Sequence, residues 1–134
     1  DLTRQYGLDG DVRFLGKQEQ MEELLAVSDV FLLPSEYESF GLAALEAMAS
    51  AVPVISSNSG GIPEVNIEGV SGFLSPVGAL DDMAKNAIKI IKDEAVLNKF
   101  KKAAQQASTK FDIHKIVPFY EAIYDEALKN CISI

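Results

Sequence analysis

The chain has 134 residues, the size of a single domain, and its 48% hydrophobic and 24% charged residues exclude wholesale disorder and a fibrous repeat. Twelve basic against twenty acidic residues give a net charge of −8, which disfavours a nucleic-acid-binding surface. One Cys and one His exclude an internal disulfide framework and leave few soft metal ligands, and the single Cys favours a cytoplasmic protein. No apolar run approaches the roughly 20 residues that span a bilayer, so no transmembrane segment is expected.

Short β-rich apolar runs alternate with helical patterns along the first half of the chain, which predicts a parallel α/β fold. Strands are expected at residues 12–15, 29–33, 53–56 and 72–75. Helices are expected at 18–27, from Ser39 to about 49, at 80–110 with a break near Asp93, and at 113–128. The prediction is a three- or four-stranded sheet within residues 1–80 and a helical tail within residues 81–134.

The helical patterns also predict which side chains are buried. The helix at 18–27 is expected to bury a stripe made of Met21, Leu24, Leu25 and Val27. Asp112 is a candidate cap for the last helix, on which Tyr120 and Tyr124 are expected to pack as in a core.

Ligands of parallel α/β sheets bind beyond the carboxyl ends of the strands, and residues 34–41 are the most informative segment there. A strand leads into a loop that turns directly into a helix, with Ser39 as the candidate N-cap. The amides of Phe40, Gly41 and Leu42 are then unpaired donors that a phosphate or diphosphate can approach. The segment has neither a Gly-rich loop nor a Walker lysine, which excludes a P-loop.

Two carboxylates, Glu38 and Glu46, flank this helix start and lie eight residues apart. On an ideal helix that spacing gives about 12 Å of rise, too far for a close acid/base pair. They can instead contact the two ends of an elongated ligand that has sugar hydroxyls at both ends and an anionic middle. The alternative is a solvated helix Glu and a capping Glu with no ligand.

The segment from Glu38 to Glu46 resembles the Glu-x7-Glu motif of the family 4 (group 1) retaining glycosyltransferases of the GT-B type. Further blocks of the chain match that family in the right order, namely 14–16, 28–35, 53–55, 60–64 and 69–73. The resemblance implies a Rossmann-like parallel sheet flanked by helices, the truncated C-terminal, nucleotide-sugar-binding domain of such an enzyme. Its first strands and the acceptor-binding domain would lie upstream of Asp1, where an initiator Met is also lacking, so we expect a piece of a longer protein.

Within the family, the chain is most similar to the subfamily of bacillithiol synthesis that transfers N-acetylglucosamine from UDP-GlcNAc to L-malate. The segments that carry this likeness are 14–18, 36–42, 60–65 and 115–121. The likeness implies UDP-GlcNAc as donor and L-malate as acceptor, with no cofactor and no bound metal.

The resemblance also implies roles for individual residues. Glu38 would be the catalytic residue, holding donor-sugar hydroxyls near the reacting centre, and Glu46 would bind the ribose. Backbone around Gly16 and Lys17 would border the uracil, with Leu24 or Leu25 in the same pocket. The sugar and diphosphate would face Ser39, Phe40, Gly41 and Leu42.

The chain departs from the family pattern at Ala51, where relatives usually have a Gly after the helix; a left-handed conformation there costs Ala about 1 kcal/mol. The Arg and Lys that neutralise the diphosphate in relatives would lie upstream of Asp1, so the chain alone is expected to bind its donor weakly. Three alternatives stay open: a UDP-binding module without activity on its own, a family 4 enzyme acting on polysaccharide or lipid acceptors, and a purely structural α/β domain.

Overall fold

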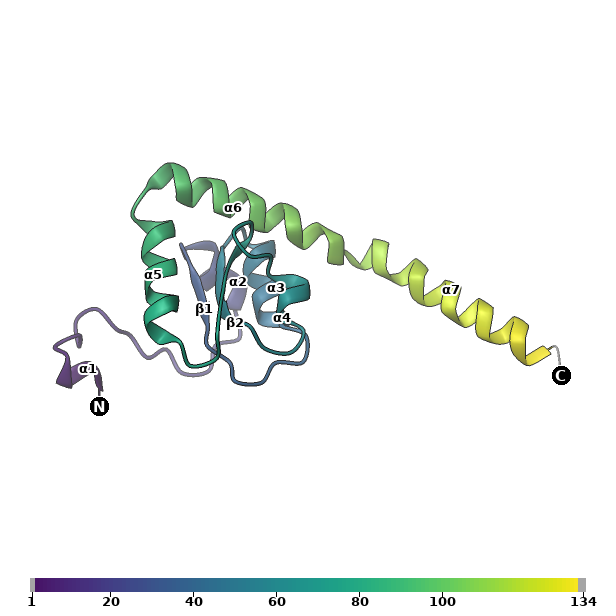
Figure 1. Cartoon of the computed structure of the whole chain (residues 1–134), viewed down its shortest axis with the longest axis horizontal. Helices are drawn as coiled ribbons and strands as arrows, with labels where there is room; N and C mark the ends of the chain where they lie inside the picture. Colours follow the sequence, from purple (N-terminus) through teal and green to yellow (C-terminus); the bar gives the residue numbers. More distant parts are fainter. Residues whose placement is uncertain (1, 133–134) are drawn as a thin grey trace.

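The computed structural model describes residues 2–132 and has a three-stranded parallel sheet at its centre (Figure 1). The strands lie in the order β1 (Phe31–Leu33), β2 (Val54–Ser57) and β3 (Gly72–Ser75). Leu32 pairs with Ile55, and Ile55 pairs with Phe73. All three strands run the same way, so their carboxyl ends meet at one edge of the sheet, as the sequence predicted.

Helices connect and surround these strands, which confirms the predicted α/β class. They are α1 (Leu2–Gln5), α2 (Met21–Ala26), α3 (Leu42–Ala49), α4 (Ile62–Val65), α5 (Leu80–Ile91), α6 (Glu94–Ser108), the 3-10 helix η1 (Thr109–Phe111) and α7 (Ile113–Ile132). The predicted break near Asp93 is confirmed, because the Asp93 carboxylate accepts hydrogen bonds from the amides of Ala95 and Val96 and so begins α6.

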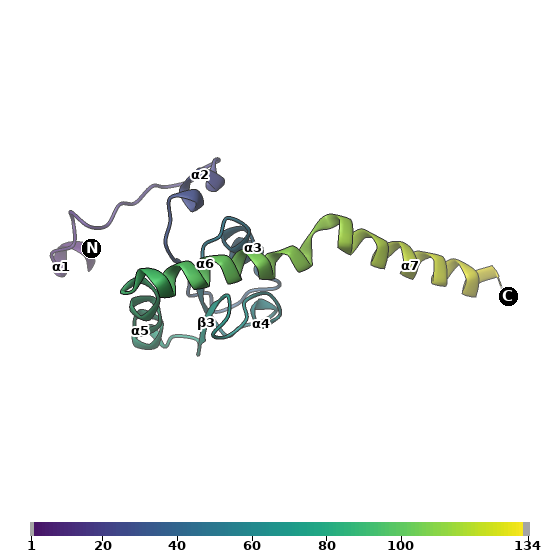
Figure 2. The same cartoon turned by 90° about the horizontal axis from the view of Figure 1, so that it is seen from above.

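The two faces of the sheet are covered by separate cores. Val54 packs with side chains of α2 and α3 on one face, whereas its neighbour Ile55 packs with side chains of α5 on the other. Helix α6 serves both cores, since Phe100 joins the second and Ala104 joins the first. Helices α5 and α6 therefore belong to the layers that cover the sheet, and it is α7 that extends away from it (Figures 1 and 2).

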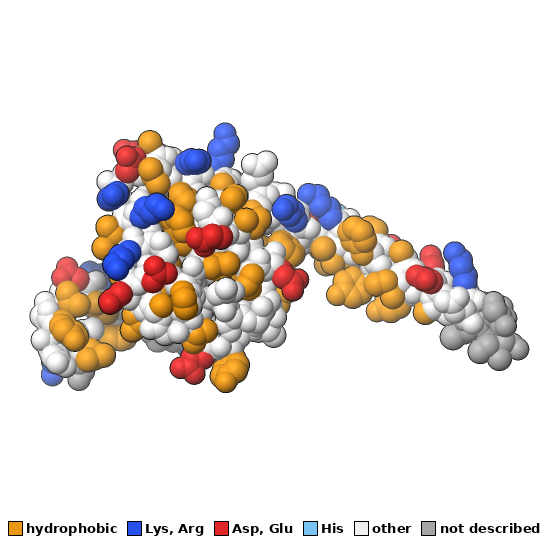
Figure 3. All heavy atoms as spheres, viewed as in Figure 1, with side chains coloured by type: hydrophobic (Ala, Val, Ile, Leu, Met, Phe, Trp, Pro, Cys, Tyr) orange, Lys and Arg blue, Asp and Glu red, His pale blue; other side chains and the backbone are white. Residues whose placement is uncertain are grey.

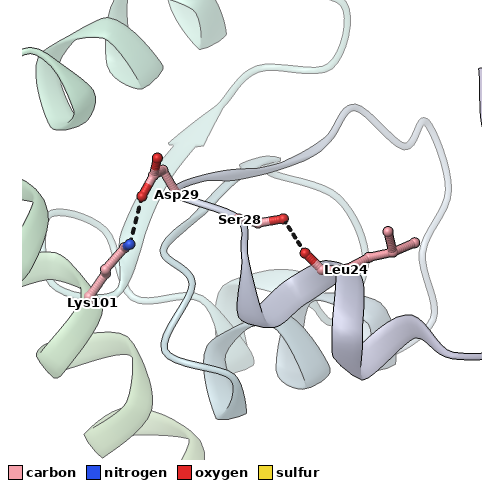
Figure 4. Close-up of polar contacts among 4 residues, drawn as sticks. All are labelled: Leu24, Ser28, Asp29 and Lys101. Atoms are coloured by element: carbon pink, nitrogen blue, oxygen red, sulfur yellow. Dashed lines mark hydrogen bonds and ion pairs between the residues drawn. The ribbon is translucent and has the colours of Figure 1, made fainter. Parts of the chain in front are cut away.

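An ion pair fixes α6 against the segment that enters β1. The Lys101 ammonium lies 2.6 Å from the Asp29 carboxylate, and just upstream the Ser28 hydroxyl donates a hydrogen bond to the Leu24 carbonyl at the end of α2 (Figure 4). These contacts set the position from which β1 leads to its carboxyl end.

The last helix begins where the sequence predicted, with the Asp112 carboxylate accepting a hydrogen bond from the His114 amide at 2.9 Å. The predicted core-like packing of Tyr120 and Tyr124 is wrong for this chain, because the two residues are 58% and 64% exposed. Figure 3 shows apolar side chains gathered along α7, which has no other element of the described chain against most of its length.

Two further predictions near the N-terminus are wrong. Residues 12–15 form no strand, and Phe14 is 79% exposed, because a strand needs a neighbouring ladder and these residues pair with none of β1–β3. Helix α2 is shorter than predicted and buries only Leu25 of the expected stripe; Val27 lies beyond its end and is 82% exposed.

Candidate functional site

The loop after β1 carries the candidate residues to the carboxyl edge of the sheet. The predicted N-cap at Ser39 is wrong, because α3 begins at Leu42 and its N-cap is Gly41. Gly41 is buried and has φ 90° and ψ 43°, a left-handed conformation that disfavours any side chain. A Cβ at this position would also lie 3.4 Å from the Ile62 side chain, so the start of α3 packs closely against α4.

Glu38 is half-buried beside this helix start. Its Oε1 accepts a hydrogen bond from the Gly41 amide at 3.3 Å, so that amide is not a free donor as predicted. The amides of Phe40 and Leu42 have no hydrogen-bond acceptor among residues 2–132. Since Glu38 lies outside α3, its separation from Glu46 is not the helical rise that the sequence suggested.

The side chain of Phe40 contacts an element outside its own loop. Its ring packs edge-to-face on Phe111, with centroids 5.6 Å apart and an interplanar angle of 79°. Phe40 therefore ties the loop to η1 through its ring, and it also lines a hollow of about 480 Å³ between α3 and α7.

A second loop, after β2, packs directly against the first. The Gly61 amide donates to the Glu38 carbonyl at 3.2 Å, and the Ser59 hydroxyl donates to the Glu36 carbonyl at 2.7 Å. Gly60 has φ 55°, and a Cβ there would overlap the Glu38 carbonyl oxygen. Gly60 and Gly61 thus allow the close approach of the Glu38 loop.

Glu46 is exposed and faces a hollow of about 380 Å³ between α2 and α3. The residues that line the hollow are Glu19, Met21, Glu22, Leu25, Glu46, Ala49 and Ser50. Of the two leucines suggested for a base pocket, the structure brings Leu25 beside Glu46. The sequence reasoning missed Glu19 and Glu22, which only the packing of α2 against α3 brings to Glu46.

The three carboxylates of this hollow, Glu19, Glu22 and Glu46, have no hydrogen-bond or ion-pair partner among residues 2–132. Hydroxyl or N–H donors of a ligand can therefore be accepted there without breaking an existing contact. The floor of the hollow is apolar, since it includes Met21 and Leu25. The carboxylates can accept hydrogen bonds from ribose hydroxyls and the apolar side chains can contact the face of a base, so the hollow suits a nucleoside.

Gly16 and Lys17 lie in the exposed segment that precedes α2. Gly16 has φ 65°, and Lys17 lines a second hollow of about 470 Å³ together with Gln18, Glu19 and Gln20. Glu19 lines both hollows, so they adjoin, but Gly16 and Lys17 do not line the one that contains Glu46.

Among the side chains that the structure describes, no group of three or more His, Cys, Asp or Glu is arranged to hold a metal ion. None of the described helices is both long enough and apolar enough to cross a bilayer.

Comparison with known proteins places this arrangement in a family. The sequence model of the family described as "Glycosyl transferases group 1" matches residues 1–107. The N-acetyl-alpha-D-glucosaminyl L-malate synthase of Bacillus anthracis is 45% identical over 130 residues, which are 96% of this chain and 34% of that enzyme.

Solved structures give the same result for the fold. The sucrose-phosphate synthase from Thermosynechococcus elongatus superposes with a TM-score of 0.87 at 29% identity, over 96% of this chain and 33% of that one. Anabaena Alr3699/HepE, solved in complex with UDP-glucose, superposes with a TM-score of 0.82 at 29% identity, over 92% of this chain and 35% of that one. The chain thus spans about a third of the length of each of these relatives.

These matches confirm the Rossmann-like GT-B fold expected from the sequence motifs. The family match covers 107 of 134 residues and includes the Glu38 loop, the start of α3 and Glu46. The chain belongs to the group 1 glycosyl transferases.

Proposed function

We propose that this chain is the donor-binding part of a retaining glycosyltransferase that transfers N-acetylglucosamine from UDP-GlcNAc to L-malate. The observation that carries the proposal is the start of α3, where the Glu38 carboxylate lies beside amides of Phe40 and Leu42 that have no acceptor among residues 2–132. The 45% identity to a GlcNAc-malate synthase supports the choice of donor and acceptor. The proposal includes a cytoplasmic location, in keeping with the single cysteine.

In this proposal the diphosphate of the donor lies against the N-terminus of α3. The free amides and the positive end of the helix dipole stabilise the negative charge that develops as the bond from the anomeric carbon to the diphosphate breaks. Glu38, oriented by the Gly41 amide, accepts hydrogen bonds from hydroxyls of the sugar.

The nucleoside takes the hollow between α2 and α3. Glu46 accepts hydrogen bonds from the two ribose hydroxyls, and the base rests on the apolar floor formed by Met21 and Leu25. Gly16 and Lys17, which precede α2, border the base, with Lys17 lining the adjoining hollow. Ser39 lies between the sugar and the phosphates.

Charge limits what this part can bind alone. The net charge of −8 and the three carboxylates of the hollow repel a diphosphate, and helix amides offset only part of that repulsion. We propose that basic side chains outside this chain complete the phosphate site, so that isolated residues 1–134 bind UDP weakly and do not turn over substrate.

The proposal is tested in the complete enzyme with Glu38→Ala and Glu46→Ala. We expect Glu38→Ala to lower kcat by 100-fold or more, in the range seen for removal of one group that stabilises a transition state. Glu46→Ala is expected to weaken UDP binding about tenfold or more, because hydrogen bonds to a charged acceptor are lost. Glu126→Ala, in exposed α7, is the control and should change neither quantity. Kinetics close to wild type for both site variants would show that the proposal is wrong.

A second candidate keeps the same donor site and changes the acceptor. A glycogen synthase of Mycobacterium tuberculosis is 32% identical over 127 residues, and a polysaccharide or lipid acceptor is compatible with the part of the site in this chain. Assays with UDP-GlcNAc and UDP-glucose, each with and without L-malate, separate these cases. Transfer that does not depend on L-malate would favour the second candidate.

A further inference from the structure

A fully buried amide side chain, that of Asn66, joins α4 to β2 and β3. Asn66 is 0% exposed, and its Nδ2 lies 3.1 Å from the Val54 carbonyl oxygen, 2.9 Å from the Ser56 hydroxyl and 3.3 Å from the Phe73 carbonyl oxygen. Its Oδ1 accepts a hydrogen bond from the Ser71 hydroxyl at 2.9 Å. Both ends of the amide are therefore satisfied inside the protein, which makes the arrangement specific and rigid.

These contacts fix one end of α4 to the sheet. Asn66 is the C-cap of α4, where its backbone amide donates to the Ile62 carbonyl at 2.8 Å. Its side chain reaches β2 through Val54 and β3 through Phe73. The carboxyl end of α4 thus has a fixed position relative to both strands.

The other end of α4 supports the candidate site. Gly61, the N-cap of α4, donates to the Glu38 carbonyl at 3.2 Å, and the buried Ile62 side chain lies directly under Gly41. Helix α4 is only four residues long, and it lies beside α3 in the fold (Figure 1). A shift of its carboxyl end therefore moves Glu38 and the start of α3 as well.

We propose that Asn66 is a positioning residue, which holds Glu38 and the N-terminus of α3 in the geometry that donor binding and transfer require. This inference rests on the proposed function of those two features. Asn66 itself is buried and contacts no ligand; it acts through α4 and Gly61. A displacement of about 1 Å of a catalytic group can cost 100-fold in rate, so a loosened α4 has a measurable effect.

The test replaces Asn66 with the apolar residue of nearest shape, Asn66→Leu, and, more mildly, removes one partner with Ser71→Ala. Both variants are made in the complete enzyme, and kcat and both KM values are measured per folded molecule, with UDP-GlcNAc as donor. We expect kcat to fall tenfold or more for Asn66→Leu and about threefold or more for Ser71→Ala. The KM of the acceptor should stay within twofold, because the acceptor is not held by these residues.

Two controls separate positioning from plain stability. Ile90→Ala, in the core on the opposite face of the sheet, lowers the melting temperature without touching α4, and its kcat should stay within twofold of wild type. Ser57→Ala removes a buried hydroxyl from the same strand that Asn66 contacts, and it too should leave kcat unchanged. If Asn66→Leu fails to fold, Ser71→Ala decides the matter.

If the Asn66 and Ser71 variants keep kcat within twofold at an equal folded fraction, Asn66 only stabilises the sheet and the inference is wrong. That result is distinct from a failure of the proposed function, which shows as an active Glu38→Ala enzyme. An inactive Glu38→Ala together with a fully active Asn66→Leu would overturn the positioning role alone.

Discussion

The backbone amide of Gly61 donates a hydrogen bond to the backbone carbonyl of Glu38, and this contact joins the loops at the carboxyl ends of β1 and β2. The residue before it, Gly60, lies so close to the same carbonyl that no side chain fits between them. The position of Glu38 is thus set by a neighbouring loop as much as by its own. Substitutions in that neighbouring loop are therefore expected to act on the donor site.

Gly60→Ala is expected to lower both stability and donor binding. Gly60 and Gly69 both have positive φ, at 55° and 70°, so an Ala at either position adds about 1–2 kcal/mol of backbone strain. Only at Gly60 does the new Cβ overlap the Glu38 carbonyl. A Cβ at Gly69 would have no atom within 4 Å among the described residues, apart from its own residue and its chain neighbours. The forced shift should add a further 1–3 kcal/mol or so to the loss of unfolding free energy.

The matched pair is measured by thermal unfolding and by UDP titration. Gly69→Ala should lose stability and keep its affinity for UDP, while Gly60→Ala should lose both. Equal effects of the two substitutions would mean that backbone strain alone matters and that the contact with Glu38 does not.

The hollow beside Glu46 can be tested through its apolar floor. Met21 lines the hollow and is 39% exposed, so Met21→Ala removes contact area from a bound base at little cost to the core. A loss of about 1 kcal/mol, or roughly a fivefold weaker UDP affinity, is expected from the apolar area involved. Val27→Ala, one residue beyond α2 and 82% exposed, is the control. If isothermal titration finds the same affinity in both variants, the base does not lie in this hollow.

Two adjacent serines of β2 are predicted to respond in opposite ways. Ser56 and Ser57 are 0% and 1% exposed, but the Ser56 hydroxyl is bonded to Asn66, whereas the Ser57 hydroxyl has no partner among the described residues. Ser56→Ala removes one of the three acceptors around the two N–H hydrogens of the Asn66 amide and should cost about 0.5–1.5 kcal/mol of unfolding free energy. Ser57→Ala removes an unpaired buried hydroxyl and should be neutral or stabilising. Urea denaturation of both variants checks the sign, and a loss at Ser57 equal to that at Ser56 would contradict it.

The sequence predicted those parts of the fold that depend on local pattern. The apolar run before Pro34 forms β1, and the break at Asp93 occurs because its carboxylate accepts hydrogen bonds from the amides of Ala95 and Val96. Residues 12–15 have the same β-rich composition but form no strand, because pairing depends on a neighbouring strand and not on the run itself.

The sequence pointed to the loop before α3, and the contacts within that loop were not predictable. The spacing of Glu38 and Glu46 pointed to the right helix start, yet Ser39 was wrongly expected as the cap. Gly41 has a left-handed conformation and lies next to Ile62, more than 20 positions further along the chain, and single-sequence patterns do not report such contacts. The roles inferred for Glu19, Glu22 and Asn66 likewise come from elements that meet only in the folded chain.

The departure from the family pattern at Ala51 leads to the last prediction. Ala51 has φ 59°, the one positive φ among the non-glycine residues that the structure describes. Its amide donates to the Met48 carbonyl at 3.0 Å, and the Val52 amide donates to the Ala47 carbonyl at 2.9 Å, which is the Schellman arrangement at the end of α3. This arrangement places the residue after the C-cap in the left-handed region, where Ala is strained and Gly is not.

Ala51→Gly is therefore expected to raise the free energy of unfolding by about 1 kcal/mol, and the melting temperature by a few degrees for a chain of this size. The same substitution at exposed Ala84, inside α5, should lower the free energy of unfolding by about 0.5–1 kcal/mol, because Gly there only adds chain entropy. Calorimetry of the two variants measures both signs against wild type. Val52, the next residue, is 1% exposed. A loss of stability for Ala51→Gly would mean that the Ala51 methyl group contributes more to the packing beside Val52 than the backbone strain at position 51 takes away.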